Sequence, residues 1–179
     1  MILKDLFQYF SEFVPVAVLA DTFQSSTGAP YDSLKTLVMR QADTARTLPG
    51  IRSFIIGVDA EAVRQKISQA DGTFLFIEYS NVASRIDART DRKEDRLHVA
   101  VTVATPIPSD WDQPAVLLSN DSCLEMMKAI RDALRDDRTA DGRIQWCEFP
   151  ATLSPFYSRA LANSSGWSME FDVLGYDIV

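Results

Sequence analysis

The segment from Asp137 to Glu148, DRTADGRIQWCE, has residue types and a spacing that could hold a metal ion. Oxygen-bearing side chains and one glycine fall at the positions that an EF-hand calcium loop uses, namely Asp137, Thr139, Asp141, Gly142 and Glu148. Calcium is a hard cation that prefers oxygen ligands, so the carboxylates of Asp137, Asp141 and Glu148 would bind it. Calcium binding is therefore one function that this sequence suggests.

Two features of the same segment favour a different interpretation. Thr139 stands where an EF-hand loop carries Asp or Asn, and Pro150 follows where the exiting helix should run. The alternative is a charged helix end, an Asp-Gly turn and a strand that begins near Arg143. We favour this alternative, and we expect neither a bound metal nor a cofactor.

His98 is the only histidine of the chain and the natural candidate for a general base. It would need a positioned nucleophile or carboxylate, and the sequence near it offers Asp95 and Ser80. The chain contains none of the GxSxG, GxxxxGK[ST], HExxH or GxGxxG motifs. We therefore interpret His98 as a residue on a sheet face and predict that the protein is not an enzyme.

A run of mixed charges, RIDARTDRKEDR, extends from Arg85 to Arg96 and contains five basic and four acidic residues. An arm that binds nucleic acid would not carry so many carboxylates. The intermixed signs suit a hairpin tip that stays in water or meets a complementary surface on a neighbouring subunit. The candidate interface residues are Arg85, Arg89, Arg92 and Lys93.

The composition is that of a globular protein with one sizeable core, because 46% of the 179 residues are hydrophobic and 24% are charged. We expect a single domain over residues 1–179. A net charge of −7 argues against binding to a phosphate backbone. The longest apolar run, residues 13–20, is far shorter than the roughly 18 residues of a membrane span. A cytoplasmic protein with neither nucleic-acid nor membrane partners is therefore expected.

The spacing of apolar side chains predicts four helices. They cover residues 2–14, 34–48, 60–70 and 119–134, the last with a capping box from Ser122 to Glu125. Residues 21–32 are rich in Ser, Thr, Gly, Pro and Asp, which predicts a mobile loop.

Strands are predicted at residues 51–58, 73–79, 97–103, 143–149 and 167–174, and residues 82–90 continue or pair with the second of them. This order predicts an α+β fold. A largely antiparallel sheet with a long hairpin would be packed by an N-terminal helix and by a long helix before the last strands. Residues 34–70 read as a helix-strand-helix insertion.

Three parts of this order resemble the tail-terminator and tail-completion proteins of tailed bacteriophages. They are the opening helix MILKDLFQYF, the hairpin from TFLFIEY to VTVAT, and the helix LEMMKAIRDALRD with the closing strand SGWSMEFDVL. The resemblance implies a structural protein of phage or prophage origin that forms a ring, often hexameric, through sheet edges and loops. It also implies contacts with other tail proteins, a place in the virion, and neither catalysis nor cofactor.

Overall fold

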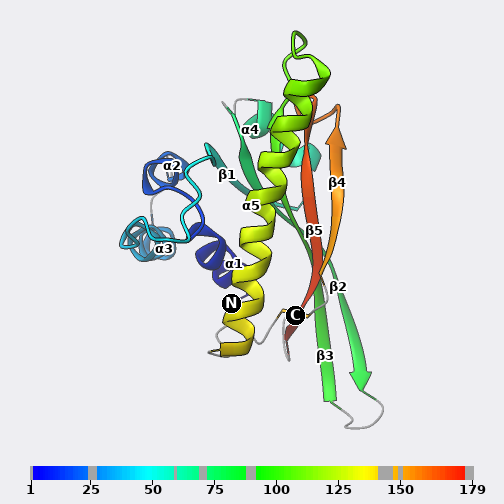
Figure 1. Ribbon diagram of the computed structural model, residues 1–179. Coiled ribbons are helices and arrows are strands. Elements are labelled where there is room, and N and C mark those ends of the chain that lie inside the picture. The colour runs from blue at the N-terminus through cyan, green and yellow to red at the C-terminus, as the bar shows by residue number, and fades with distance from the viewer. Residues whose placement is uncertain are drawn as a thin grey trace.

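A five-stranded sheet forms the centre of the protein (Figure 1). The computed structural model describes residues 2–23, 28–58, 60–68, 72–87, 92–140, 147–148 and 151–175. The helices are α1 (Ile2–Ser11), α2 (Val16–Thr22), α3 (Ala29–Met39), α4 (Ala60–Ser68) and α5 (Gln113–Ala140). The strands are β1 (Ser53–Gly57), β2 (Phe74–Asp87), β3 (Arg92–Pro106), β4 (Thr152–Ser158) and β5 (Ser164–Gly175).

The strands lie in the order β1-β2-β3-β5-β4. β1 is parallel to β2, with α4 as the crossover that parallel neighbours require, and every other pair is antiparallel. The predicted α+β class, the largely antiparallel sheet and the long hairpin are thus confirmed. The helix, strand and helix predicted for residues 34–70 correspond in order to α3, β1 and α4, and β1 adds one strand to the edge of the sheet. The predicted bounds of the first helix, 34–48, were wrong, since α3 begins at Ala29 and ends at Met39.

One face of the sheet is covered by α1 and α5 and holds the main core. β3 alternates with a period of two, and this places Leu97, Val99, Val101 and Val103 on the covered face. The residues that α5 buries against them recur at helical spacing and are Cys123, Met127, Ile130 and Leu134. Phe10 of α1 reaches Phe171 of β5, with ring centroids 6.5 Å apart. Each such apolar side chain contributes about 1.5–3 kcal/mol by leaving water.

The opposite face is covered over only part of its area. Val63 and Ile67 of α4 pack on a cluster that includes Ile55, Phe74 and Phe76. Further along the same strands this face presents polar residues, among them the exposed His98 of β3.

Two of the predictions for loops and helix starts were wrong. The predicted loop at residues 21–32 overlaps two helices, since α2 continues to Thr22 and α3 begins at Ala29 with a proline in its first turn. The predicted capping box at Ser122 is also wrong, because α5 already begins at Gln113. Its cap is Asp112, whose Oδ1 accepts a hydrogen bond from the N–H of Ala115 at 2.9 Å.

The strands near the C-terminus differ in part from the predicted ones. The predicted strand at residues 143–149 lies mostly outside the described residues, and Cys147 forms an isolated bridge with Val173. The edge strand β4 was not predicted, because its sequence, TLSPFYS, contains a proline and two serines. Proline is tolerated on an edge strand, where one side of the backbone has no ladder to complete.

Candidate functional site

Asp137, the first residue of the calcium-like loop, lies on the last turns of α5 and is buried. Both of its carboxylate oxygens accept hydrogen bonds from the guanidinium group of Arg46, each at 2.5 Å. The hydroxyl of Tyr9 also donates to Oδ2 at 3.0 Å, so the carboxylate joins α1, the segment after α3 and the end of α5. This is the bidentate, charge-assisted geometry in which an Arg–carboxylate pair is strongest.

The surroundings of this pair change the acidity of its members. Burial, and then the negative charge of Asp137, raise the pKa of Tyr9 above its ordinary value, so the phenol stays protonated. The hydrogen bond to Asp137 raises the pKa of Arg46. A second carboxylate, Glu12, lies 3.6 Å from Nη1 of Arg46. We therefore interpret Arg46, Asp137, Glu12 and Tyr9 as a structural junction of one cation, two carboxylates and a neutral phenol.

Of the three predicted calcium ligands, the two that the structure describes are each bound by an arginine. Glu148 accepts a hydrogen bond from Nη1 of Arg96 at 2.8 Å, whereas Asp137 binds Arg46. Asp141 lies outside the described residues. Over the described ranges, no three His, Cys, Asp or Glu side chains converge on a point where a metal could sit. A calcium ion bound by Asp137 and Glu148 would have to displace both guanidinium groups.

His98 lies on the open face of the sheet between two carboxylates of β5. Its Nδ1 is 3.1 Å from Oδ1 of Asp172, and its Nε2 is 3.9 Å from Oε2 of Glu170. Of the partners suggested by the sequence, Asp95 is buried and accepts a hydrogen bond from Ser84 instead. His98 is thus an exposed sheet-face residue in a cross-strand pair with Asp172.

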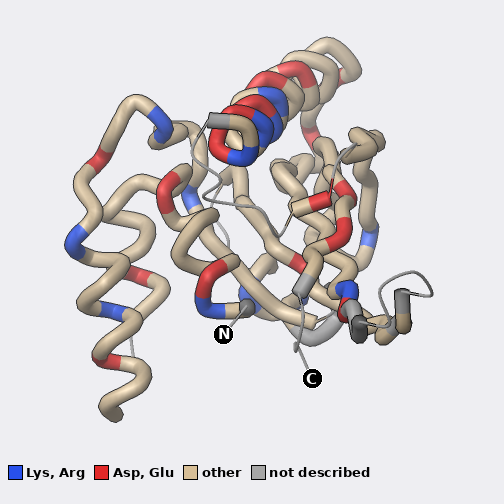
Figure 2. The backbone as a smooth tube through the Cα atoms, turned by 90° about the horizontal axis from the view of Figure 1, so that it is seen from below, with Lys and Arg blue, Asp and Glu red and all other residues tan. Residues whose placement is uncertain are grey.

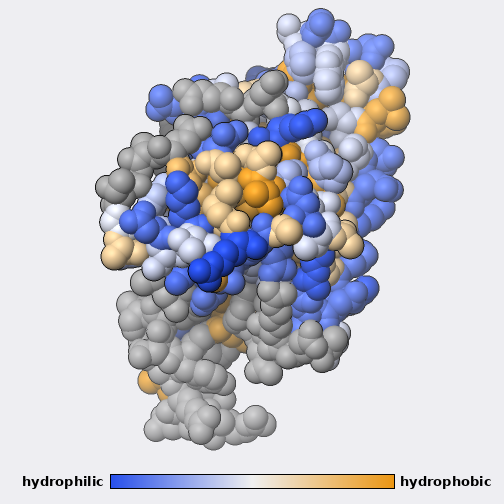
Figure 3. Space-filling view, turned by 90° about the vertical axis from the view of Figure 1, so that its left-hand side faces the viewer, coloured by the Kyte–Doolittle hydropathy of each residue, from blue (hydrophilic) through white to orange (hydrophobic). Residues whose placement is uncertain are grey.

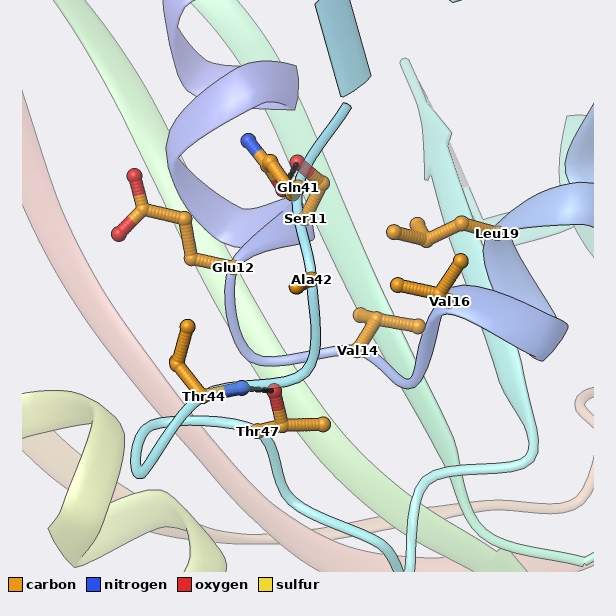
Figure 4. A pocket seen from close by; sticks show the side chains of 9 residues that line it. All are labelled: Ser11, Glu12, Val14, Val16, Leu19, Gln41, Ala42, Thr44 and Thr47. Carbon is orange, nitrogen blue, oxygen red and sulfur yellow. Dashed lines mark hydrogen bonds between the residues drawn. The ribbon is translucent and has the colours of Figure 1, made fainter. Parts of the chain in front are cut away.

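A small pocket lies between the end of α1, α2 and residues 41–47 (Figure 4). Its volume is about 210 Å³, below the roughly 300–1,000 Å³ of sites for small molecules. Its apolar lining comes from Val14, Val16, Leu19 and Ala42, and its polar lining from Ser11, Glu12, Gln41, Thr44 and Thr47. A pocket of this size and lining suits one aliphatic side chain better than a cofactor.

The hairpin arm, which we define as residues 80–87 of β2 with residues 92–97 of β3, extends beyond the end of β1, and only its residues 95–97 pair with β5 (Figure 1). β1 pairs with β2 only as far as Glu78, so the outer edge of β2 beyond that residue has no partner strand among the described residues. A register shift between Tyr79 and Val82 marks the start of the arm. Ile86 on this arm is 70% exposed, and Val82 is also exposed.

Three of the four candidate interface residues lie on the strands of this arm. Arg85 belongs to β2, opposite Glu94, while Arg92 and Lys93 belong to β3, opposite Asp87 and Ile86. Arg89 lies outside the described residues. The sequence prediction relied on charge and missed Val82 and Ile86, although their alternation with Ala83 and Arg85 continues the strand.

A second exposed apolar surface lies at the start of α5. Leu117 and Leu118 are 69% and 67% exposed, and Trp111 just before the helix is partly exposed. The rest of the exposed helix surface carries alternating charges, which Figure 2 shows along its length. Arg131 and Asp132, for example, approach to 2.8 Å.

Comparison of the chain with models of protein families, with curated proteins and with solved structures finds no significant match. Among the helices of the described ranges, none has both the length and the hydropathy needed to cross a bilayer.

Proposed function

We propose that this protein is a non-enzymatic structural subunit that assembles with further copies of itself. Its order of elements resembles that of the phage tail-terminator and tail-completion proteins. We propose that it is a ring-forming subunit of this class. Its other partners would be tail or assembly proteins of the same system.

The observation that carries this proposal is the hairpin arm. An exposed strand edge with unpaired N–H and C=O groups is a template for another strand, and proteins usually protect such edges with Pro, Lys or a covering segment. Within residues 80–87 there is neither Pro nor Lys, and the protective features of this edge are the register shift at its start and the charged residues Arg85 and Asp87. The arm also exposes Ile86 and Val82 beside that edge, so covering it with a neighbouring subunit would bury apolar surface and satisfy backbone groups together.

Light scattering after size-exclusion chromatography, combined with negative-stain imaging, tests the proposal. We expect a mass of several subunits that grows with protein concentration, and rings in the images. A monomer at every accessible concentration would contradict self-assembly.

The variant Ile86→Glu tests whether the arm takes part. We expect it to lower the assembled mass, because a carboxylate at this position would be buried without a partner in the assembly. Tyr157→Glu is the matched control, since Tyr157 also carries an exposed apolar ring but lies on β4, at the opposite edge of the sheet from the arm. Equal assembly of both variants would exclude the arm as an interface.

The charges of the arm provide an independent test. Replacing Arg89 and Arg92 together by Glu should weaken self-association while the circular dichroism spectrum and thermal transition stay unchanged. If the assembled mass is unchanged in this variant, the charged segment is a solvated turn and not an interface.

A further inference from the structure

The described part of the sheet has three stretches of free edge, and they differ in what a further strand would meet. β4 carries Pro155 at its centre, which has no N–H to donate to a neighbour. β1 is five residues long, and α2 and α4 contact it. Figure 3 faces the side that carries α2 and α3, where the surface is apolar at its centre and hydrophilic around it. From Val82 to Asp87, β2 keeps one register with β3, so its outer edge offers the longest row of backbone groups that no proline interrupts.

The free length of β2 matches the same stretch of a second copy. When two copies pair antiparallel across a two-fold axis at Ser84, residues equally far before and after Ser84 lie opposite each other. Glu78, where β1 stops, then faces a position past Asp87, where β2 ends. The β1 strand of neither copy therefore obstructs the other, and residues 81–87 of both copies can pair along their whole length.

The exposed apolar residues of this edge face each other in that arrangement. Val82 is opposite Leu97, whose side chain is buried on the covered face of the sheet. Ile86 is four residues further along β2 and so lies on the same face. Val82 is 37% exposed and Ile86 is 70% exposed. Across the axis at Ser84, Val82 of each copy lies opposite Ile86 of the other, so two such apolar pairs leave water together.

Other positions of the axis fit the sequence less well. An axis at Arg85 would set two copies of this cation opposite each other, which destabilises a cross-strand pair. An axis at Ala83 would set Ile86 opposite a serine, and an axis at Ile86 would leave Val82 past the end of the partner's β2. With the axis at Ser84, Arg85 lies opposite Ala83. The sequence therefore selects one register.

We infer that the free edge of β2 pairs antiparallel with the same edge of a second copy, across a two-fold axis at Ser84. This inference rests on the proposed self-assembly and specifies the geometry of its arm contact. The contact is isologous, because each copy gives and receives the same surface, and it joins copies in pairs. A ring that uses it is therefore doubled, with the arms of one layer against those of the other, and its mass corresponds to an even number of chains.

A disulfide at the axis tests the register. Opposite residues of antiparallel strands have Cα atoms about 4.5–5.5 Å apart, within the range of about 4.4–6.8 Å that a disulfide spans. After mild oxidation we expect Ser84→Cys to form a covalent dimer with itself, and both native cysteines are buried. Ser80→Cys is the matched control, since Ser80 is another exposed serine of the arm. Its two copies would lie about 26 Å apart at about 3.3 Å per residue, so it should stay uncross-linked.

A second pair of variants tests the same register without replacing Ser84, whose hydroxyl donates to the buried Asp95. Val82→Cys and Ile86→Cys should cross-link when mixed, whereas Ile86→Cys alone should not, because its two copies lie about 13 Å apart. Cross-linking of Ile86→Cys with itself, or none in the mixture while the wild-type chain assembles, would overturn the inference and leave the proposed self-assembly standing. A wild-type chain that is monomeric at every concentration would refute both.

Discussion

Replacement of Asp137 by Ala should destabilise the fold, because its carboxylate holds three segments together. The side chain of Asp137 is only 6% exposed, so its loss leaves the buried Tyr9 hydroxyl without its acceptor, at about 1–3 kcal/mol. Removing one partner of a fully buried ion pair costs about 3–5 kcal/mol. Arg46 is a third exposed and regains water, which reduces that contribution. We expect a total loss of about 2–4 kcal/mol.

Urea unfolding followed by circular dichroism at neutral pH measures this loss directly. For a chain of this size, about 3 kcal/mol corresponds to a fall in Tm of roughly 6–12 °C. Asp136→Ala is the matched control, because the neighbouring side chain is 69% exposed and lies 3.6 Å from Arg135, so its removal should cost less than about 0.5 kcal/mol. Equal stability of the two variants would refute the structural role of Asp137.

The same experiment separates this role from calcium binding. A ligand that binds only the folded state raises its stability, and the rise depends on ligand concentration. With Asp137 committed to Arg46 and Tyr9, millimolar calcium should leave the unfolding midpoint of the wild-type protein unchanged. A midpoint that rises with calcium in the wild type and not in Asp137→Ala would show that the carboxylate is a metal ligand.

Two further predictions concern the sheet and its pH dependence. Gly166→Ala should cost at least about 3 kcal/mol in urea unfolding, because an added Cβ would press on the carbonyl of Val103 and lie 2.6 Å from Cα of Ala104. Gly50→Ala is the control and should be nearly neutral, because a Cβ at Gly50 meets only the flexible side chain of Met126. The free energy of unfolding should fall above about pH 9, by about 1.4 kcal/mol per pH unit for each group concerned. Burial raises the pKa of Cys147 to about 12 and also raises that of Tyr9, so the unfolded chain releases protons that the folded chain retains. Burial also raises the pKa of Cys123, so both thiols contribute to the decline that begins near pH 9. Cys147→Ala should make the decline between pH 9 and 10 shallower, and an unchanged profile would show that the Cys147 thiol is not protected.

Local periodicity was sufficient to predict much of the fold. The alternation from Leu97 to Val103 and the stripe from Cys123 to Leu134 each match a buried face in the structure. α2 was missed because it is short and follows Pro15, and β4 because Pro155 and two serines interrupt its strand-forming residues. In α2 and β4, tertiary packing outweighs the intrinsic preference of the residues for helix or strand.

The sequence could not predict the junction at Asp137. Its partners Tyr9 and Arg46 are 128 and 91 residues away in the chain, so no local pattern connects them. An isolated Asp beside Thr, Asp and Gly matches a calcium loop by composition alone, whereas its role depends on which segments the fold brings to the end of α5. The same holds for Leu117 and Leu118, since their exposure depends on which side of α5 meets the sheet.

The strand order also leaves β3 without one of its neighbours during part of the synthesis of the chain. β1, β2 and β3 lie side by side and are all complete by Pro106, but the second neighbour of β3 begins only at Ser164. At about 5–20 residues per second, the roughly 60 intervening residues take about 3–12 seconds to synthesise. During that interval β3 and its valines lack β5 throughout, and they lack α5 until the chain has been made as far as Ala140. A nascent chain therefore passes through a stage at which chaperone protection of this strand matters most.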